Sequence, residues 1–249
     1  MTSEVRAAVF RPDDERIDDA AELLASLGAT PVPDPMLAVD ATGATPARGD
    51  WTVFTSKTGV ELAAEAGWTP TETRVATIGP ATADAARAEG WEVDLVPEEY
   101  SSAGLVDALP PAVGDDATVT VARSDHGSAV LLDGLREVGI ETTETVLYRL
   151  VRPEGAGEST ELAADGALEA ALFTSSLTVE HFLEAAGERG VRPATVDGLG
   201  EAVVGCIGEP TAATAREHGI DVDVVPGEAT FETLATTVVE RAAPSHHEA

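Results

Sequence analysis

The chain has 249 residues, with 15 lysines and arginines against 45 aspartates and glutamates, so its formal net charge is −30. A field of this sign repels nucleic acids and anionic membrane surfaces, which excludes proteins that bind them through a basic face. Hydrophobic residues make up 43% of the chain, enough to build a folded core, and this excludes a disordered polyanion.

Short apolar segments alternate with amphipathic segments along the chain. Residues 5–10 form a predicted strand, and the acidic residues at 13–15 then favour a helix start, with an apolar stripe that ends at Gly28. The remaining predicted strands are 52–55, 74–78, 93–96, 118–122, 170–174, 203–207 and 222–225, and helical patterns such as 127–138 lie between them. This alternation predicts an α/β protein built from βαβ units with parallel sheets.

Two sequence patterns occur twice in the chain. Val53-Phe54-Thr55-Ser56 returns as Leu172-Phe173-Thr174-Ser175. The segment at 78–83, Ile-Gly-Pro-Ala-Thr-Ala, returns at 207–212 as Ile-Gly-Glu-Pro-Thr-Ala. Internal repeats of this kind predict two similar α/β domains, each assembled from two repeated segments.

The repeat leaves open how the four segments combine. Either each half of the chain forms one domain, or the middle segments form an inserted domain, 42–144, while both chain ends form a discontinuous domain, 1–36 plus 152–249. In the second arrangement the chain crosses between domains at 37–41 and 145–151. Both crossings are extended and apolar, so they could pair as a two-stranded hinge.

The repeated segments place hydroxyl and glycine residues where predicted strands end and helices begin. Free backbone N–H groups and the positive end of a helix make such junctions anion-binding sites at the carboxyl edge of parallel sheets. The candidate residues are Thr55, Ser56, Gly79, Thr82, Thr174, Ser175, Gly208 and Thr211. Ordinary helix capping explains one isolated copy, whereas two copies favour a ring of donors around one carboxylate or phosphate ligand.

Three cations accompany these junctions. Arg11 and Arg123 occupy equivalent positions after predicted strands in a weaker repeat, and each could clamp a carboxylate through its bidentate guanidinium. Lys57 is the only lysine of the chain and directly follows Thr55-Ser56. Pairing with the abundant surface acids is the competing explanation for the arginines, and chance surface placement is the competing explanation for Lys57.

The other reactive side chains give weaker signals. Tyr148, in the second crossing, could donate a proton or a hydrogen bond, while packing at the hinge is the alternative. His126, His181 and His218 show no metal-ligand spacing, and Cys206 is interpreted as an inert thiol of a buried strand. A single cysteine also excludes an intrachain disulfide and a multi-cysteine metal site, so no metal site is predicted.

The composition is typical of a protein from a salt-rich cytoplasm. The acids are spread along the chain, lysine is nearly absent, and aromatic residues make up only 4%. Molar salt shortens the Debye length to about 3 Å and screens the repulsion among these charges. Residues 1–14 show no signal-peptide pattern, and no apolar run approaches the roughly 20 residues of a membrane span. We therefore expect a cytoplasmic, halophilic protein that binds neither nucleic acid nor membranes.

Taken in order, these segments resemble the uroporphyrinogen-III synthase family over nearly the whole chain, from 9–12 to 230–234. The matching segments are 53–56, 78–83, Arg123-Ser124-Asp125, 146–148, Phe173-Thr174-Ser175-Ser176 and 206–212. Their order and spacing together make the resemblance specific.

The resemblance implies two parallel-sheet βαβ domains, one of them discontinuous, joined by a two-stranded hinge. It implies an enzyme that cyclises linear hydroxymethylbilane to uroporphyrinogen III, with inversion of ring D, loss of water and no cofactor. This reaction belongs to the biosynthesis of tetrapyrroles such as heme, siroheme and cobalamin. We expect a monomer that acts on this small molecule.

The resemblance also implies roles for individual residues. Tyr148 matches, by position, a tyrosine thought to assist departure of the hydroxyl group. Residues that match proposed carboxylate-binding positions are Thr82, Thr174, Ser175 and Thr211, and Ser124 and Ser176 lie in the matching segments as further candidates. Lys57 and Thr58 stand where relatives often carry a proline and an arginine, so the cation beside this junction departs from the family pattern.

A second hypothesis fits the same residues, namely a non-catalytic two-domain protein that binds an anionic small molecule. A salt-adapted regulatory protein without a working site is a third. Only an enzyme would shift the cyclised product from isomer I to isomer III, whereas a binding protein would merely retain the ligand.

Overall fold

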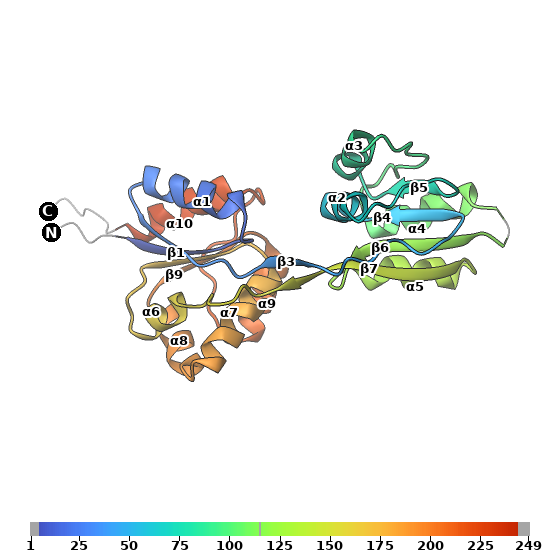
Figure 1. Ribbon diagram of the computed structural model, residues 1–249. Coiled ribbons are helices and arrows are strands. Elements are labelled where there is room, and N and C mark those ends of the chain that lie inside the picture. Colours follow the sequence, from blue (N-terminus) through green and yellow to red (C-terminus); the bar gives the residue numbers. More distant parts are fainter. Residues whose placement is uncertain (1–4, 115, 244–249) are drawn as a thin grey trace, which may run out of the picture. The chain divides into compact units, whose positions relative to one another are not determined.

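The chain divides into two compact units in the computed structural model, which describes residues 5–114 and 116–243 (Figure 1). We call Met1–Ala38 with Val151–Ala249 the discontinuous domain and Val39–Leu150 the inserted domain. The unit boundaries fall inside the crossings 37–41 and 145–151, whose role as a hinge stays a prediction. Each unit is an α/β domain with a largely parallel sheet, so the predicted fold class is confirmed.

The discontinuous domain is a four-stranded parallel sheet between two helical layers. Its strand order is β2 (Thr30–Pro33), β1 (Arg6–Phe10), β8 (Ala170–Phe173) and β9 (Val203–Cys206). Helices α1 (Glu15–Ser26) and α10 (Phe231–Ala242) cover one face, and α6 (Ser159–Ala164), α7 (Ser176–Glu188), α8 (Arg192–Leu199) and α9 (Glu209–Glu217) cover the other (Figure 1). Both chain ends thus contribute to one sheet, because β1 pairs with β8.

Alternation along the central strands of this sheet explains its two cores. Val9 and Leu172 pack with α1 and α10, whereas the next residues, Phe10 and Phe173, pack with the opposite layer. The rings of Phe10 and Phe173 stack with centroids 4.5 Å apart, and Phe182 of α7 closes the cluster at 4.8 Å from Phe10. All three rings are fully buried. The aromatic cluster therefore fixes α7 directly beneath the ends of β1 and β8.

The inserted domain repeats this plan with an additional strand. Its order is β3 (Ala38–Ala41), β7 (Glu141–Val151), β6 (Thr118–Ser124), β4 (Trp51–Phe54) and β5 (Arg74–Thr77). Helices α2 (Lys57–Glu65) and α3 (Pro80–Ala88) cover one face, and α4 (Ser102–Ala112) and α5 (Ala129–Glu137) the other (Figure 1). The β6 pairings with β4 and with β7 are parallel.

Two predicted strands, 93–96 and 222–225, are wrong. Each contributes a single bridge to its sheet, Ala76 to Leu95 and Gly205 to Val224. The physical reason is the same in both copies: a carboxylate takes the place of a backbone carbonyl. The side chain of Asp94 accepts from the N–H of Val75 at 2.9 Å, and that of Asp223 accepts from Val204 at 3.0 Å. A charged side chain in this position ends the sheet and blocks further strand pairing.

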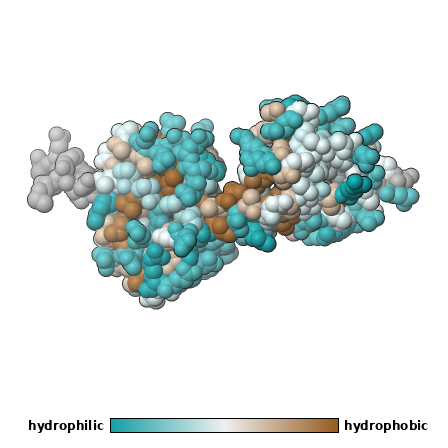
Figure 2. Space-filling model, in the orientation of Figure 1, coloured by the Kyte–Doolittle hydropathy of each residue, from teal (hydrophilic) through white to brown (hydrophobic). Residues whose placement is uncertain are grey.

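Hydrophilic side chains are spread over the visible face of both domains, among side chains of intermediate hydropathy (Figure 2). Apolar side chains gather over the segment of β3 and β7, where Val39 is 46% exposed. Within 5–114 and 116–243, the helices are either too short or too polar to cross a membrane.

A buried carboxylate ties the two chain segments of the discontinuous domain together. Asp34 is 5% exposed and accepts hydrogen bonds from the backbone N–H groups of Gly157 at 2.7 Å and Ser159 at 2.9 Å. The hydroxyl of Ser159 donates to the same carboxylate. These three donors compensate the desolvation of the charge and join the segment before the first crossing to the segment after the second.

We expect Asp34→Asn to destabilise the protein by about 2–4 kcal/mol, because the amide NH₂ would face N–H donors and leave them buried without an acceptor. Asp221→Asn is the matched control, since Asp221 is exposed. Urea unfolding in molar KCl measures both, and equal midpoints for the two variants would contradict the role of Asp34.

Candidate active site

Parallel register brings several predicted residues to the carboxyl edge of the inserted domain's sheet. Phe54 pairs with Ala122 on one side and with Thr77 on the other, and Ser124 pairs with Tyr148. Residues that lie in these strands or directly after them line a cavity of about 270 Å³. They are Thr55, Ser56, Arg123, Ser124 and Tyr148, beside Ile78, Ser102, Gly127, Ser128 and Leu131. The carboxyl edge is where open parallel sheets bind ligands, so this cavity is the candidate active site.

Tyr148 is held at this cavity by a serine at a helix start. Its hydroxyl donates to Ser56 Oγ at 3.0 Å, and the same oxygen accepts from the N–H of Gly59 at 3.0 Å as the N-cap of α2. The tyrosine is 7% exposed and its ring belongs to the core cluster beneath the cavity. A side chain anchored at both ring and hydroxyl has one orientation, which suits a positioned acid.

Arg123 lies in the cavity wall but is already engaged. Its side chain is 8% exposed, its Nε donates to Glu144 Oε1 at 2.6 Å, and its Nη1 donates to the carbonyl of Ser128. Gly127 passes so close that an added Cβ would lie 2.5 Å from Arg123 Cδ. The guanidinium therefore has its charge paired within the domain.

The other predicted residues of this domain divide into two kinds. Lys57 is exposed on α2 and pairs with Glu61 at 3.3 Å, so it does not line the cavity. Gly79 caps α3 without a side-chain hydrogen bond, and Thr82 in the first turn is 5% exposed. Within the described chain, the Thr82 hydroxyl has no hydrogen-bond partner, so it and the first-turn N–H groups are available to an anion.

The carboxyl edge of the discontinuous domain has the same order of junctions. Phe173 pairs with Phe10 and with Cys206, so Thr174 follows its strand between Arg11 and Ile207. The Thr174 hydroxyl donates to the carbonyl of Phe10 at 2.7 Å. The hydroxyl of Thr174 therefore joins the ends of β8 and β1, which is a structural role. Its hydrogen-bond donor is already used within the domain.

The first turns of α7 and α9 differ in how much they offer a ligand. Ser175 forms a capping box with Thr178, and Ser176 donates to the carbonyl of Pro210 at 3.2 Å. Gly208 caps α9 without a side-chain hydrogen bond, and Thr211 is 4% exposed with no hydrogen-bonded partner among residues 5–114 and 116–243. Thr82 and Thr211 thus share one arrangement: a buried threonine with an unused hydroxyl in a helix that a glycine caps.

Sequence reasoning missed several neighbours of these residues. Glu144 and Ser128 bind Arg123, and the ring of Phe231 lies 4.6 Å from the guanidinium carbon of Arg11. Glu144 is one of 45 acidic residues in the chain, and its pairing with Arg123 depends on the register between β6 and β7. Only the tertiary structure could therefore select it.

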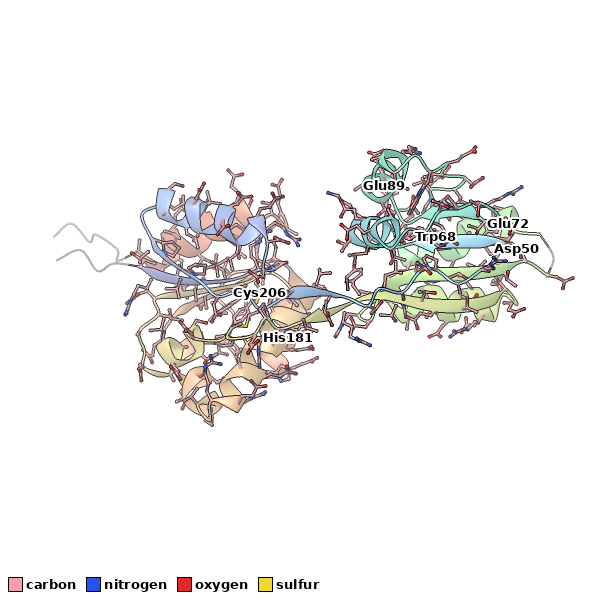
Figure 3. All side chains as sticks on the ribbon, in the orientation of Figure 1. Asp50, Trp68, Glu72, Glu89, His181 and Cys206 are labelled. Carbon is pink, nitrogen blue, oxygen red and sulfur yellow. The ribbon has the colours of Figure 1, made fainter. Side chains whose placement is uncertain are left out.

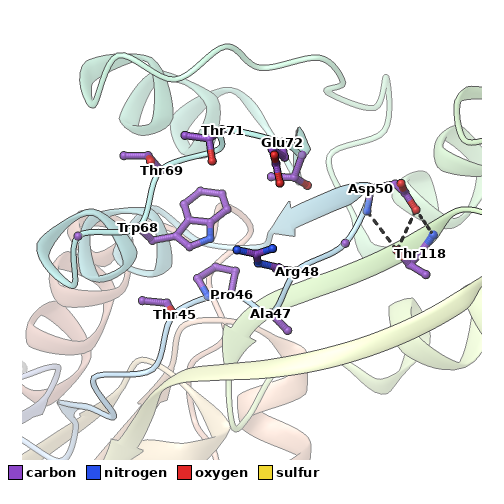
Figure 4. Close-up of a pocket in the computed structure, with 13 residues that line it drawn as sticks. Thr45, Pro46, Ala47, Arg48, Asp50, Trp68, Thr69, Thr71, Glu72 and Thr118 are labelled. Carbon is purple, nitrogen blue, oxygen red and sulfur yellow. Dashed lines mark hydrogen bonds between the residues drawn. The ribbon is translucent and has the colours of Figure 1, made fainter.

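A larger hollow of about 610 Å³ lies at the opposite, amino-terminal edge of the same sheet (Figure 4). Trp68 and Arg48 point into it, and Asp50 and Glu72 are among its lining residues, with the Asp50 carboxylate turned to Thr118. Backbone and side-chain hydrogen bonds from Thr118 lower the pKa of Asp50, which keeps that carboxylate charged. Because its lining includes two acidic residues and one arginine, the hollow does not suit a polyanion, and we assign the site to the smaller cavity.

Metal and thiol chemistry find no support in the structure's described part. No group of three or more His, Cys, Asp or Glu side chains in 5–114 and 116–243 could hold a metal ion. Cys206 lies within the sheet of the discontinuous domain (Figure 3). Burial raises the pKa of its thiol to about 12, so the nucleophilic thiolate is not formed near neutral pH.

Fold and site together define a two-domain parallel α/β protein whose strand-end junctions suit an anionic small molecule. A family model described as uroporphyrinogen-III synthase HemD matches residues 18–236. The chain belongs to the uroporphyrinogen-III synthase family, an enzyme family, and the predicted resemblance is confirmed.

Individual relatives agree with this family. The chain is 35% identical over 229 residues to a Methanothermobacter thermautotrophicus protein provisionally named uroporphyrinogen-III synthase, covering 86% of this chain and 89% of that one. It is 26% identical to the Synechococcus elongatus uroporphyrinogen-III synthase, covering 83% and 80%.

Solved structures show the same fold. A mutant uroporphyrinogen III synthase from Thermus thermophilus has a TM-score of 0.64 at 20% identity, covering 96% of this chain and 98% of that one. The Helicobacter pylori enzyme has a TM-score of 0.60 at 15% identity, covering 95% and 100%.

We expect Cys206 to resist thiol reagents in the folded protein, because at pH 8 a pKa of about 12 leaves a thiolate fraction of about 10⁻⁴. Labelling with a disulfide reagent in molar KCl checks this, and unfolding in urea should release one reactive thiol per chain. Rapid stoichiometric labelling before unfolding would contradict the assignment.

Proposed function

We propose that this protein cyclises hydroxymethylbilane to uroporphyrinogen III in tetrapyrrole biosynthesis, with Tyr148 as the acid that assists departure of the hydroxyl group. Family membership supports the reaction, and one geometric observation supports the residue: the Tyr148 hydroxyl is fixed 3.0 Å from Ser56 Oγ in the cavity at the carboxyl edge. No cofactor takes part in the proposed reaction.

The proposed chemistry requires an acid and a dry, ordered environment rather than a strong nucleophile. Protonation of the hydroxymethyl oxygen lets its C–O bond break, water leaves, and an azafulvene cation remains on the substrate. The substituted carbon of ring D attacks this cation, which forms a spiro-linked pyrrolenine. The bond from that carbon to the methylene bridge of ring C then breaks and leaves a second azafulvene cation on ring C. The free α-carbon of ring D attacks this bridge carbon, and loss of the proton from the attacking carbon restores the pyrrole with ring D inverted. Positioning and exclusion of water select this attack over simple head-to-tail closure.

Substrate carboxylates need local donors, because the protein as a whole repels anions. The linear substrate carries eight carboxylates, and the chain carries a net charge of −30. Buried helix starts supply partial positive charge without adding a cation, and Thr82 and Thr211 add an unused hydroxyl to α3 and α9. We propose that each domain binds substrate carboxylates at these first turns, with the backbone junctions at Thr55, Ser124, Ser175 and Ser176 as further contacts.

We further propose that the enzyme is a monomer of a salt-rich cytoplasm, and that β3 and β7 act as its hinge. The surplus of 30 acidic charges and the hydrophilic surface support the salt adaptation (Figure 2). Pairing of β3 with β7 supports the hinge, since both crossings of the chain lie in these two strands.

Tyr148→Phe should lower kcat by about 100-fold, the lower end of the range for general acid catalysis, and leave KM nearly unchanged. Tyr100→Phe is the matched control, because Tyr100 is the other of the chain's two tyrosines and is 63% exposed. A coupled hydroxymethylbilane assay in molar KCl with product isomer analysis measures both. Full turnover in Tyr148→Phe would exclude Tyr148 as the acid. If the wild-type protein leaves isomer I as the product, the result would support the hypothesis of a non-catalytic binding protein.

The melting temperature should rise with KCl, mainly between 0.1 M and about 1 M, where the Debye length falls from about 10 Å to about 3 Å. Thermal unfolding at pH 7 in KCl, with sucrose as a non-ionic control, measures this. A melting temperature that responds equally to sucrose and KCl would contradict charge screening.

A further inference from the structure

Arg11 directly follows β1 and Arg123 is the next-to-last residue of the equivalent strand β6, but the structure uses the two arginines differently. Arg123 is paired with Glu144 at 2.6 Å and with a backbone carbonyl. Arg11, in contrast, has no carboxylate within 4.0 Å in the described part of the chain. One copy of the repeated arginine is therefore committed to its own domain, while the other feels Asp14 and Asp19 only at longer range and forms no direct ion pair in the described part of the chain.

The surroundings of Arg11 strengthen the attraction of its guanidinium for a carboxylate. Its Nε atom is buried without a hydrogen-bond partner, and burial lowers the pKa of the guanidinium from its ordinary value. Asp14 and Asp19 attract the guanidinium electrostatically, but the carboxylate of Asp14 accepts from the Nε of Arg16 at 2.9 Å. A partly desolvated guanidinium with unused donors binds an incoming carboxylate more strongly than a hydrated one does.

Phe231 supports the guanidinium from one side. The Arg11 Cζ atom lies 4.6 Å from the centroid of the Phe231 ring, which is the first residue of α10. Thr230 caps this helix by accepting from the N–H of Thr233 at 3.2 Å, so the backbone that bears the ring is fixed. Stacking occupies a face of the guanidinium and leaves the N–H donors at its edge available for a planar carboxylate.

We infer that Arg11 is the guanidinium of the discontinuous domain that binds a substrate carboxylate, and that Phe231 is its positioning residue. The inference rests on the proposed function, because the carboxylate belongs to the proposed substrate. It assigns different roles to the two repeated arginines: Arg11 binds the ligand, whereas Arg123 supports the wall of the cavity beside Tyr148.

Four variants test the pair in molar KCl. Arg11→Gln should raise KM about tenfold or more, the loss expected for a charged hydrogen-bonded contact, with kcat within about twofold of wild type. Phe231→Leu, which keeps apolar volume but removes the ring, should raise KM about two- to fivefold, and Phe231→Tyr should restore the wild-type value. Arg74→Gln is the control, because Arg74 also stacks on an aromatic ring, Trp51, at 5.5 Å, but at the amino end of β5.

A direct binding measurement separates this inference from the proposed function. Uroporphyrin, a fluorescent octacarboxylate, serves as the probe, and its Kd should follow the same order as KM across the variants. If the wild-type protein binds the probe but makes no isomer III, the proposed function is overturned, and the Kd values of the variants then decide whether Arg11 binds a carboxylate. Active wild type with unchanged KM and Kd in Arg11→Gln overturns the inference. The positioning role of Phe231 is also overturned if Phe231→Leu lowers the melting temperature without a shift in KM and Phe231→Tyr does not restore that temperature.

Discussion

The in-register parallel pairing of β1 with β8 and of β4 with β6 is the constraint on which the rest of the structure depends. Parallel strands must end at the same edge of a sheet, so residues far apart in the sequence meet there whatever their separation. Phe10 opposite Phe173 and Phe54 opposite Ala122 place Arg11 beside Thr174 and Thr55 beside Arg123. A shift of register by one residue would reverse every side chain between the two faces and dissolve both junctions.

The two domains keep one plan but use it for different chemistry. Both have a glycine-capped helix with a buried threonine, Thr82 or Thr211, and at the edge of both sheets a carboxylate accepts the hydrogen bond that a backbone carbonyl would take. In the inserted domain β7 takes the place that β2 has in the discontinuous domain, and it supplies Tyr148 and the acid that neutralises Arg123. The two domains therefore share the anion-binding framework, while the longer strand at this place, 11 residues against 4, provides the position of the acid.

A strongly acidic protein that acts on a polyacid needs donors that contribute little net charge. Helix starts, backbone amides and hydroxyls satisfy this need, because their partial charges act over short distances and are unaffected by the acids on the outer surface. Molar salt screens the remaining long-range repulsion, so the local donors decide binding. The near absence of lysine is consistent with this division, since Lys57 lies outside the cavity and pairs with Glu61.

The sequence by itself determined the fold class, the internal repeat, the family and the strand-end junctions, because alternating periodicities and duplicated segments are local properties of the chain. It could not show that 93–96 and 222–225 are not strands. Each of these segments forms a single bridge, and the side chains of Asp94 and Asp223 take the place of further backbone pairing. Nor could it separate Arg11 from Arg123, since their partners, Phe231 and Glu144, are distant in the chain. Only the tertiary structure decided which arginine is paired, because ion pairing depends on register and burial that no short segment encodes.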